Sequence, residues 1–145
     1  MDGFTCRLMQ NFRSLLPQMV EMQRGKIIFI SSRAGVSPSA GLAVHSGTKH
    51  MLEALAKALR QELKNTGVTV GVVRPGGVNT PGYAHATGAV SDDARKTLGT
   101  WIPTDPAKCL QPENVAKTVV SMLDMMEVAD VQEISIESPP TPRKS

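Results

Sequence analysis

Aromatic residues are scarce in this chain of 145 residues, which has three Phe, one Trp and one Tyr. An excess of charge of one sign is also missing, because 16 Lys and Arg against 13 Asp and Glu leave a net charge of +3 at pH 7. Nucleic-acid surfaces combine a concentrated basic patch with aromatic stacking platforms. We therefore expect no nucleic-acid partner.

Cysteine is rare as well, and Cys6 and Cys109 are too few for a disulfide scaffold. This favours a reducing, cytoplasmic location. No apolar run approaches the roughly 20 residues of a membrane span, so none is expected. The first residues lack the form of a secretory signal; Arg7 and Arg13 would suit a mitochondrial presequence, but Asp2 favours a packing helix. Histidines at metal-ligand spacing are missing too, so no metal site is expected.

Short apolar runs alternate with amphipathic stretches, which predicts an α/β fold. Residues 26–30 and 68–73 are continuous apolar runs, typical of parallel strands buried on both faces, and residues 131–137 alternate as a strand near a sheet edge does. Helices are expected over about 3–21 and 45–65 and from Pro112 onward. We expect one partial domain over residues 1–137 and a flexible tail over 138–145.

Each expected helix has an apolar stripe. In the first helix the stripe comprises Phe4, Leu8, Phe12, Leu15 and Met19. The second helix has small residues at Ala54 and Ala58, which would allow close approach of another helix, and Gly67 supplies a left-handed stop after it. The long stretch 74–110 is irregular, with a short helix expected over 92–97 and the single tyrosine, Tyr83, within it.

Three polar residues fall where a strand–helix–strand unit would expose them. Ser32 follows the first strand, and His45 and Lys49 lie four residues apart on one face of the following helix. Pro75 and Gly76 end the next strand at the same sheet edge, where open α/β sheets bind ligands. Considered alone, Ser32 is a loop serine and Lys49 a solvated helix lysine; their joint placement favours a site.

Several segments together resemble the second half of a short-chain dehydrogenase/reductase. They are LPQM at 16–19, GKIIFISSRAG at 25–35, SGTK at 46–49, VVRPGGVNT at 72–80 and QPENVA at 111–116. The last of these, with residues 131–136, resembles the 3-hydroxy-acid and farnesol dehydrogenase branch. The resemblance implies the latter half of a doubly wound, Rossmann-like domain, with three parallel strands remaining.

The resemblance also implies the roles of individual residues. In the family a Ser, a Tyr and a Lys carry out the chemistry; Ser32 and Lys49 match the first and last, and His45 stands at the tyrosine position. Pro75, Gly76, Val78 and Thr80 match the turn that contacts the cofactor, as Lys49 also does. The family's assisting Asn position is occupied by Phe4.

Two departures bear on activity. The glycine-rich TGxxxGxG turn and the NNAG segment of the family occur nowhere in this sequence. His45 is either a degraded acid/base, which we favour because an imidazole reaches less far than a phenol, or an adapted one.

The sequence therefore predicts an NAD- or NADP-dependent oxidoreductase by descent. It would act on an alcohol or carbonyl, and be truncated and weakly active or inactive, with cofactor binding by this chain alone not expected. The alternative is a non-catalytic module that forms a homo-oligomer or pairs with a full-length relative.

Overall fold

The computed structural model describes residues 3–38, 40–83, 93, 105 and 108–139, apart from the side chains of residues 3–6 and 9. Its elements follow in the order α1 (Gly3–Glu21), β1 (Gly25–Ile30), η1 (Arg33–Gly35), α2 (Ala43–Glu62), β2 (Val68–Pro75), α5 (Pro112–Met125) and β3 (Glu133–Ile136). Apart from Asp93, the predicted helix at 92–97 falls outside the described part, as do the side chain of Phe4 and most of the tail. None of the described helices is long and apolar enough to cross a bilayer.

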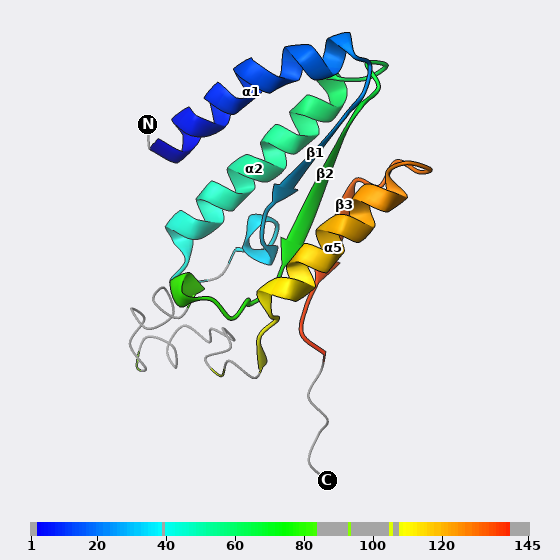
Figure 1. Ribbon diagram of the computed structural model, residues 1–145. Coiled ribbons are helices and arrows are strands. Elements are labelled where there is room, and N and C mark those ends of the chain that lie inside the picture. Colours follow the sequence, from blue (N-terminus) through cyan, green and yellow to red (C-terminus); the bar gives the residue numbers. More distant parts are fainter. Residues whose placement is uncertain (1–2, 39, 84–92, 94–104, 106–107, 140–145) are drawn as a thin grey trace.

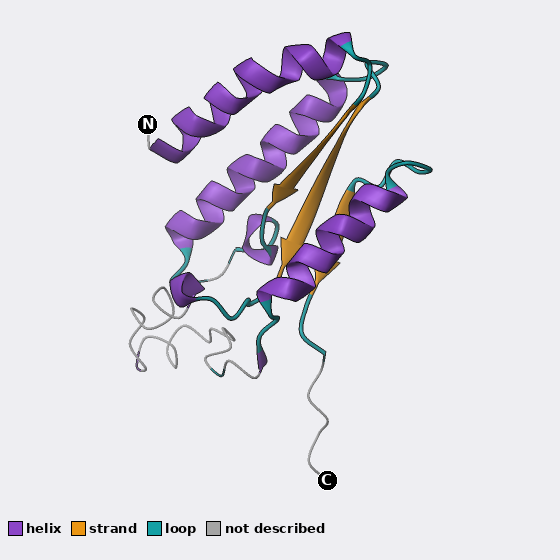
Figure 2. Ribbon diagram, viewed as in Figure 1, coloured by secondary structure: helices purple, strands orange, loops and turns teal. Residues whose placement is uncertain are grey.

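The three strands form one parallel sheet in the order β1-β2-β3. Helices α1 and α2 lie on one face of this sheet and α5 lies on the other, which gives three layers (Figure 1). Figure 2 shows the strands between these two helical layers. The expected fold class is thereby confirmed: it is a three-stranded, Rossmann-like parallel sheet with flanking helices.

Alternate residues of β2 face opposite layers, as the two-residue period of a strand requires. Val70 and Val72 face α1 and α2, where they pack with Phe29, Leu52 and Ala56. On the other face the core is smaller and consists of Val73, Met122 and Met126, with Ile28 and Ile134 packed against it. Continuous apolar runs are therefore explained by burial on both faces.

The apolar stripe of α1 differs from the predicted one. Leu8, Phe12, Leu16 and Met19 pack against the core. Leu15, which the sequence placed in the stripe, is 52% exposed. Steps of four, four and three residues keep one helical face on the sheet, and Leu15 lies at the margin of that face, on the side away from Leu16. Pro17 lies inside α1 without ending it.

Some boundaries also differ from expectation. Helix α2 begins two residues before His45 and ends at Glu62, before the expected residue 65. The chain then turns toward β2 through Asn65 and Gly67, whose φ angles are positive, 67° and 74°. Strand β2 extends through Pro75, since its last residues pair with β3. Strand β3 begins at Glu133 rather than at residue 131.

Candidate active site

The turn after β1 holds Ser32 at the carboxyl end of the sheet. Ser32 caps the short helix η1, and its Oγ accepts a hydrogen bond from the backbone N–H of Ala34 at 3.2 Å. This cap holds Ser32 in place at the start of η1. Because Oγ uses a lone pair in this contact, the hydroxyl proton can be donated to another group.

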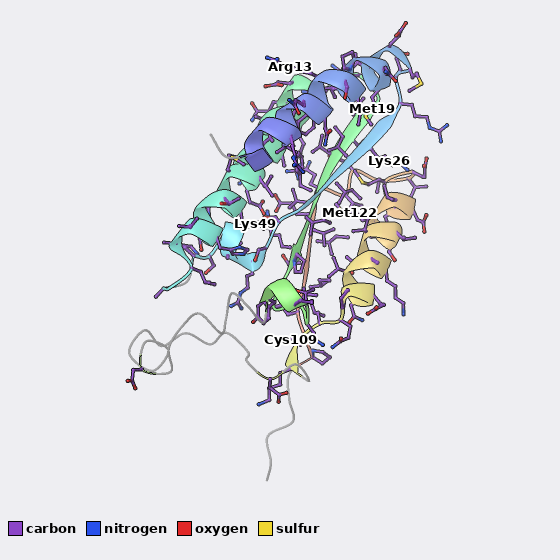
Figure 3. The ribbon with its side chains drawn as sticks, turned by 60° about the vertical axis from the view of Figure 1, so that its left-hand side comes forward. Arg13, Met19, Lys26, Lys49, Cys109 and Met122 are labelled. Carbon is purple, nitrogen blue, oxygen red and sulfur yellow. The ribbon has the colours of Figure 1, made fainter. Side chains whose placement is uncertain are left out.

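Lys49 reaches the same edge from α2. Its Nζ donates a hydrogen bond to the carbonyl oxygen of Ile30, the last residue of β1, at 2.9 Å. Figure 3 shows Lys49 on α2 beside the end of that strand. Burial lowers the pKa of the Lys49 ammonium from its ordinary value. Lys49 is thus anchored at the end of β1. Its partner, Ile30, lies two residues before Ser32 in sequence.

His45 lies one helical turn before Lys49 on α2 and is exposed. Its pKa is lowered from its ordinary value, first by partial desolvation and then by the positive charge of Lys49. The predicted proximity of these two residues on one helical face is consistent with that electrostatic effect. At pH 7 the imidazole is therefore neutral.

The turn after β2 is held by main-chain hydrogen bonds. Gly76 N–H donates to Ile136 O at 2.8 Å, Leu110 N–H donates to Gly77 O at 2.8 Å, and Asn79 N–H donates to Leu110 O at 2.8 Å. These bonds flank Val78, which forms a parallel bridge with Leu110. In such a bridge the N–H and carbonyl of Val78 itself point to the opposite side.

Tyr83 covers this turn. A side chain added at Gly77 would lie 2.8 Å from the Tyr83 hydroxyl, so only glycine leaves room for the phenol there. Thr80 Oγ1 accepts a hydrogen bond from Tyr83 N–H at 3.1 Å. Burial, together with the nearby Cys109, raises the pKa of Tyr83 to about 12. Thr80, predicted to touch a cofactor, thus also shapes the Tyr83 segment.

Two charged residues that the sequence prediction did not assign to the site adjoin it. Arg74, immediately before Pro75, forms an ion pair with Glu53 of α2 and another with Glu133 of β3, each at 2.7 Å. The sequence contains a sign of this pair. Glu53 is next to Leu52 in the apolar stripe of the helix, and Arg74 interrupts an apolar strand. Opposite charges at two positions expected to be buried indicate a pair.

A hollow of about 400 Å³ lies at the opposite end of the sheet, near the start of β2. Its lining includes Arg60, Lys64, Asn65, Asp130 and Gln132. Arg60 is already committed to the carbonyls of Val70 and Gln132. Since ligands of open α/β sheets bind at the carboxyl ends of strands, we do not assign the site to this hollow. Among the described residues, no group of His, Cys, Asp or Glu is arranged to hold a metal ion.

The sequence of this chain is similar to those of several known proteins. A family model described as short chain dehydrogenase matches residues 7–91. The 3-dehydrosphinganine reductase of Danio rerio is 35% identical over 108 residues, which cover 74% of this chain and 31% of that protein. An uncharacterized short-chain type dehydrogenase/reductase of Sinorhizobium fredii is 31% identical over 124 residues, covering 86% of this chain and 47% of that protein.

Solved structures show the same fold. Actinorhodin polyketide ketoreductase with NADPH superposes with a TM-score of 0.66 at 28% identity, covering 83% of this chain and 48% of that chain. Serine dehydrogenase from Escherichia coli gives a TM-score of 0.63 at 27% identity, and the match covers 86% of this chain and 45% of that chain. The chain thus spans from under a third to about half of the length of these proteins.

Proposed function

Since the chain belongs to the short-chain dehydrogenase family, we propose that it supplies the substrate-facing part of an NAD(P)-dependent oxidoreductase acting on an alcohol or carbonyl. The observation that carries this proposal is the hydrogen bond from Lys49 to Ile30. It fixes a cation at the carboxyl end of β1, beside Ser32. A fixed cation at the ligand-binding edge of the sheet can bind cofactor hydroxyls and stabilise negative charge on a substrate oxygen.

The proposed roles follow from what each side chain can donate. Ser32 donates its hydroxyl proton to the substrate oxygen, because its Oγ is oriented by Ala34. Lys49 holds ribose hydroxyls of the cofactor. The nicotinamide, when bound, accepts or supplies the hydride. These assignments, including those of Pro75 and Gly76 in the cofactor turn, are proposals.

His45 weakens this chemistry rather than restoring it. Its lowered pKa disfavours the protonated imidazole that would have to donate a proton in reduction of a carbonyl. It is also shorter than a phenol, and a misplacement of about 1 Å can lower a rate roughly a hundredfold. We therefore propose that the protein with His45 at this position has weak or no reductase activity. A His45→Tyr variant should raise reductase activity in any active form of the protein.

Part of the cofactor fits the described residues. The N–H and carbonyl of Val78 point away from Leu110 and have no hydrogen-bond partner in the described part of the chain. A neighbouring donor and acceptor complement a carboxamide, the group that nicotinamide carries. The pyrophosphate is different, since it normally rests on a glycine-rich turn at a helix N-terminus, and this sequence has no such motif.

We propose that the chain by itself does not bind the cofactor. Titration of NADH and NADPH, followed by heat or fluorescence, should give no saturable binding at micromolar concentration. Micromolar affinity would contradict this and would show that the chain holds a cofactor-binding site without a glycine-rich segment.

Activity is tested after fusion to the glycine-rich half of a family member. The substrate panel should include 3-dehydrosphinganine, because reductases of that ketone are among the relatives, together with 3-hydroxy acids and farnesol. Turnover in the His45→Tyr fusion should be lost with Lys49→Met and retained with Lys57→Met, which changes an exposed lysine of the same helix. Equal activity in both would remove Lys49 from the site.

A second candidate is an interaction module without catalysis. Within the described residues β1 has only β2 as a neighbour, so its other edge presents unpaired backbone groups. Ala54 and Ala58 of α2 are exposed and would allow a second helix to approach closely. We propose that the chain associates with itself or with a full-length relative. Absence of cofactor binding together with a defined dimer would favour this candidate.

A further inference from the structure

We propose that Glu53 and Arg74 form a positioning pair that fixes the three segments of the candidate site relative to one another. These segments are the turn at residues 31–35, helix α2 and the turn at residues 75–80. The consequence for catalysis rests on the proposed function, whereas the positional claim concerns the chain itself and can be tested without activity.

The pair has the geometry of a fixed joint. Arg74 Nε donates to Glu53 Oε1 at 2.9 Å, and Arg74 Nη2 donates to Glu53 Oε2 at 2.7 Å. This two-point contact sets orientation as well as distance, because both groups are planar. The side chains of Glu53 and Arg74 are only 6% and 11% exposed, so water competes little for these bonds.

Each partner is directly connected to a site segment. Glu53 lies one helical turn beyond Lys49 on the same helix. Arg74 immediately precedes Pro75 and the turn that contains Val78. A hydrogen-bonded link between them therefore couples the placement of the Lys49 ammonium to that of the turn after β2.

The third segment is held against Glu53 by packing. A side chain added at Gly35 would lie 2.6 Å from Ser31 Oγ, 3.1 Å from the carbonyl oxygen of Lys49 and 3.2 Å from Glu53 Cγ. The turn that carries Ser32 is thus pressed onto α2 at Lys49 and Glu53. Only glycine allows that approach.

A second carboxylate completes the joint. Arg74 Nη1 lies 2.7 Å from Glu133 of β3, which also pairs with Arg60 at 3.5 Å. Burial raises the pKa of Glu53, but the hydrogen bonds and charge of Arg74 outweigh it and hold that pKa below its ordinary value. Since buried ion pairs add little net stability over apolar residues of the same size, placement is the contribution that such a pair makes best.

The test compares positional signals of Lys49 and His45 in the 145-residue chain. The double variant Glu53→Gln with Arg74→Gln leaves the net charge unchanged but removes the two-point contact. We expect the Lys49 side-chain ammonium signal in NMR to lose its hydrogen-bonded signature. We also expect the titration midpoint of His45 to shift toward its ordinary value. The control is Lys26→Gln, which removes the hydrogen bond from β1 to the carbonyl oxygen of Leu123 in α5 and the ion pair with Glu127, on the face of the sheet remote from Lys49.

Two further variants guard against simple unfolding. Gly35→Ala should displace the turn from α2 and change the Lys49 and His45 signals in the same direction, whereas Gly82→Ala, which meets no atom within 4 Å, should not. Arg74→Lys retains the charge without the planar fork and should give an intermediate effect. Unchanged Lys49 and His45 signals in folded double-variant protein would overturn the proposal, as would equal changes in Lys26→Gln.

The fusion enzyme separates this proposal from the proposed function. If the fusion with His45→Tyr is active, the double variant should lower kcat more than tenfold with little change in KM for substrate, since neither residue touches substrate. If the fusion is inactive while the NMR signals change as expected, the proposed function fails and the positioning role stands. If the fusion is active while the Lys49 and His45 signals of the double variant are unchanged, the proposed function stands and the positioning role is refuted.

Discussion

The ammonium of Lys49 donates a hydrogen bond to the carbonyl oxygen of Ile30, although 19 positions separate the two residues. Ser31 N–H points toward β2, where it meets Val73 O at 2.9 Å. By strand alternation the carbonyl of Ile30 faces the open edge of the sheet. A helix lysine therefore satisfies the last backbone acceptor of the edge strand, and this contact decides where the cation lies.

Removing that cation should change the titration of its neighbour. Partial desolvation and then the charge of Lys49 lower the pKa of His45. Lys49→Met removes the repulsion but not the desolvation, so the pKa of His45 should rise partway toward 6.5. NMR titration of the imidazole measures it. Lys57→Met, at an exposed position of the same helix, should leave the midpoint where it is. An unmoved midpoint in Lys49→Met would show that the two side chains do not interact.

The same shift predicts a pH dependence of stability. His45 has a lower pKa in the folded chain than the ordinary 6.5 that applies when it is unfolded. The unfolded state therefore binds more protons in that window, and the free energy of unfolding falls as pH drops below about 6.5. His45→Gln should reduce the loss of stability between pH 7 and pH 5 in urea unfolding. The carboxylates Glu53 and Glu133, whose pKa values are lowered, add their own loss only below about 4.5. Identical slopes in both proteins above pH 5 would contradict the prediction.

Two glycines should respond oppositely to alanine. Gly67 has a φ of 74°, and an added Cβ would lie 1.9 Å from the backbone oxygen of Gln23. Gly67→Ala should therefore cost more than the roughly 1–2 kcal/mol of a left-handed conformation alone. Gly47 lies in α2 with nothing within 4 Å of an added Cβ, so Gly47→Ala should stabilise by about 0.5–1 kcal/mol. Urea unfolding of both variants measures these changes, and a tolerated Gly67→Ala would mean that the loop can move.

Association should distinguish the two exposed surfaces. The double variant Ala54→Glu with Ala58→Glu places charge on the small-residue face of α2. It should abolish a defined dimer formed through that face. Ile30→Lys places charge on the edge strand, where Ile30 is 42% exposed, and should reduce pairing through β1. Light scattering over a concentration series measures both. Val128→Lys, at a residue 88% exposed beyond α5, is the control. A concentration-independent wild-type monomer would refute association through either surface.

The sequence by itself determined the layered fold. Two continuous apolar runs of strand length favoured strands buried on both faces, and the helical stripe between them favoured a parallel crossover. Local patterns contain this information because strand and helix periods differ. The resemblance to the family likewise implied Ser32, His45 and Lys49 as candidates, and their catalytic roles stay predictions.

Only the tertiary structure decided which contacts these residues make. In α1, Leu16 packs against the core and Leu15 is exposed, because the orientation of the helix depends on the surface against which it packs. Lys49 meets Ile30, and Glu53 meets Arg74, across 19 and 21 positions of sequence. No local period encodes such pairs. They form because the parallel crossover of β1, α2 and β2 brings the end of β1, the inner face of α2 and the end of β2 to one edge of the sheet.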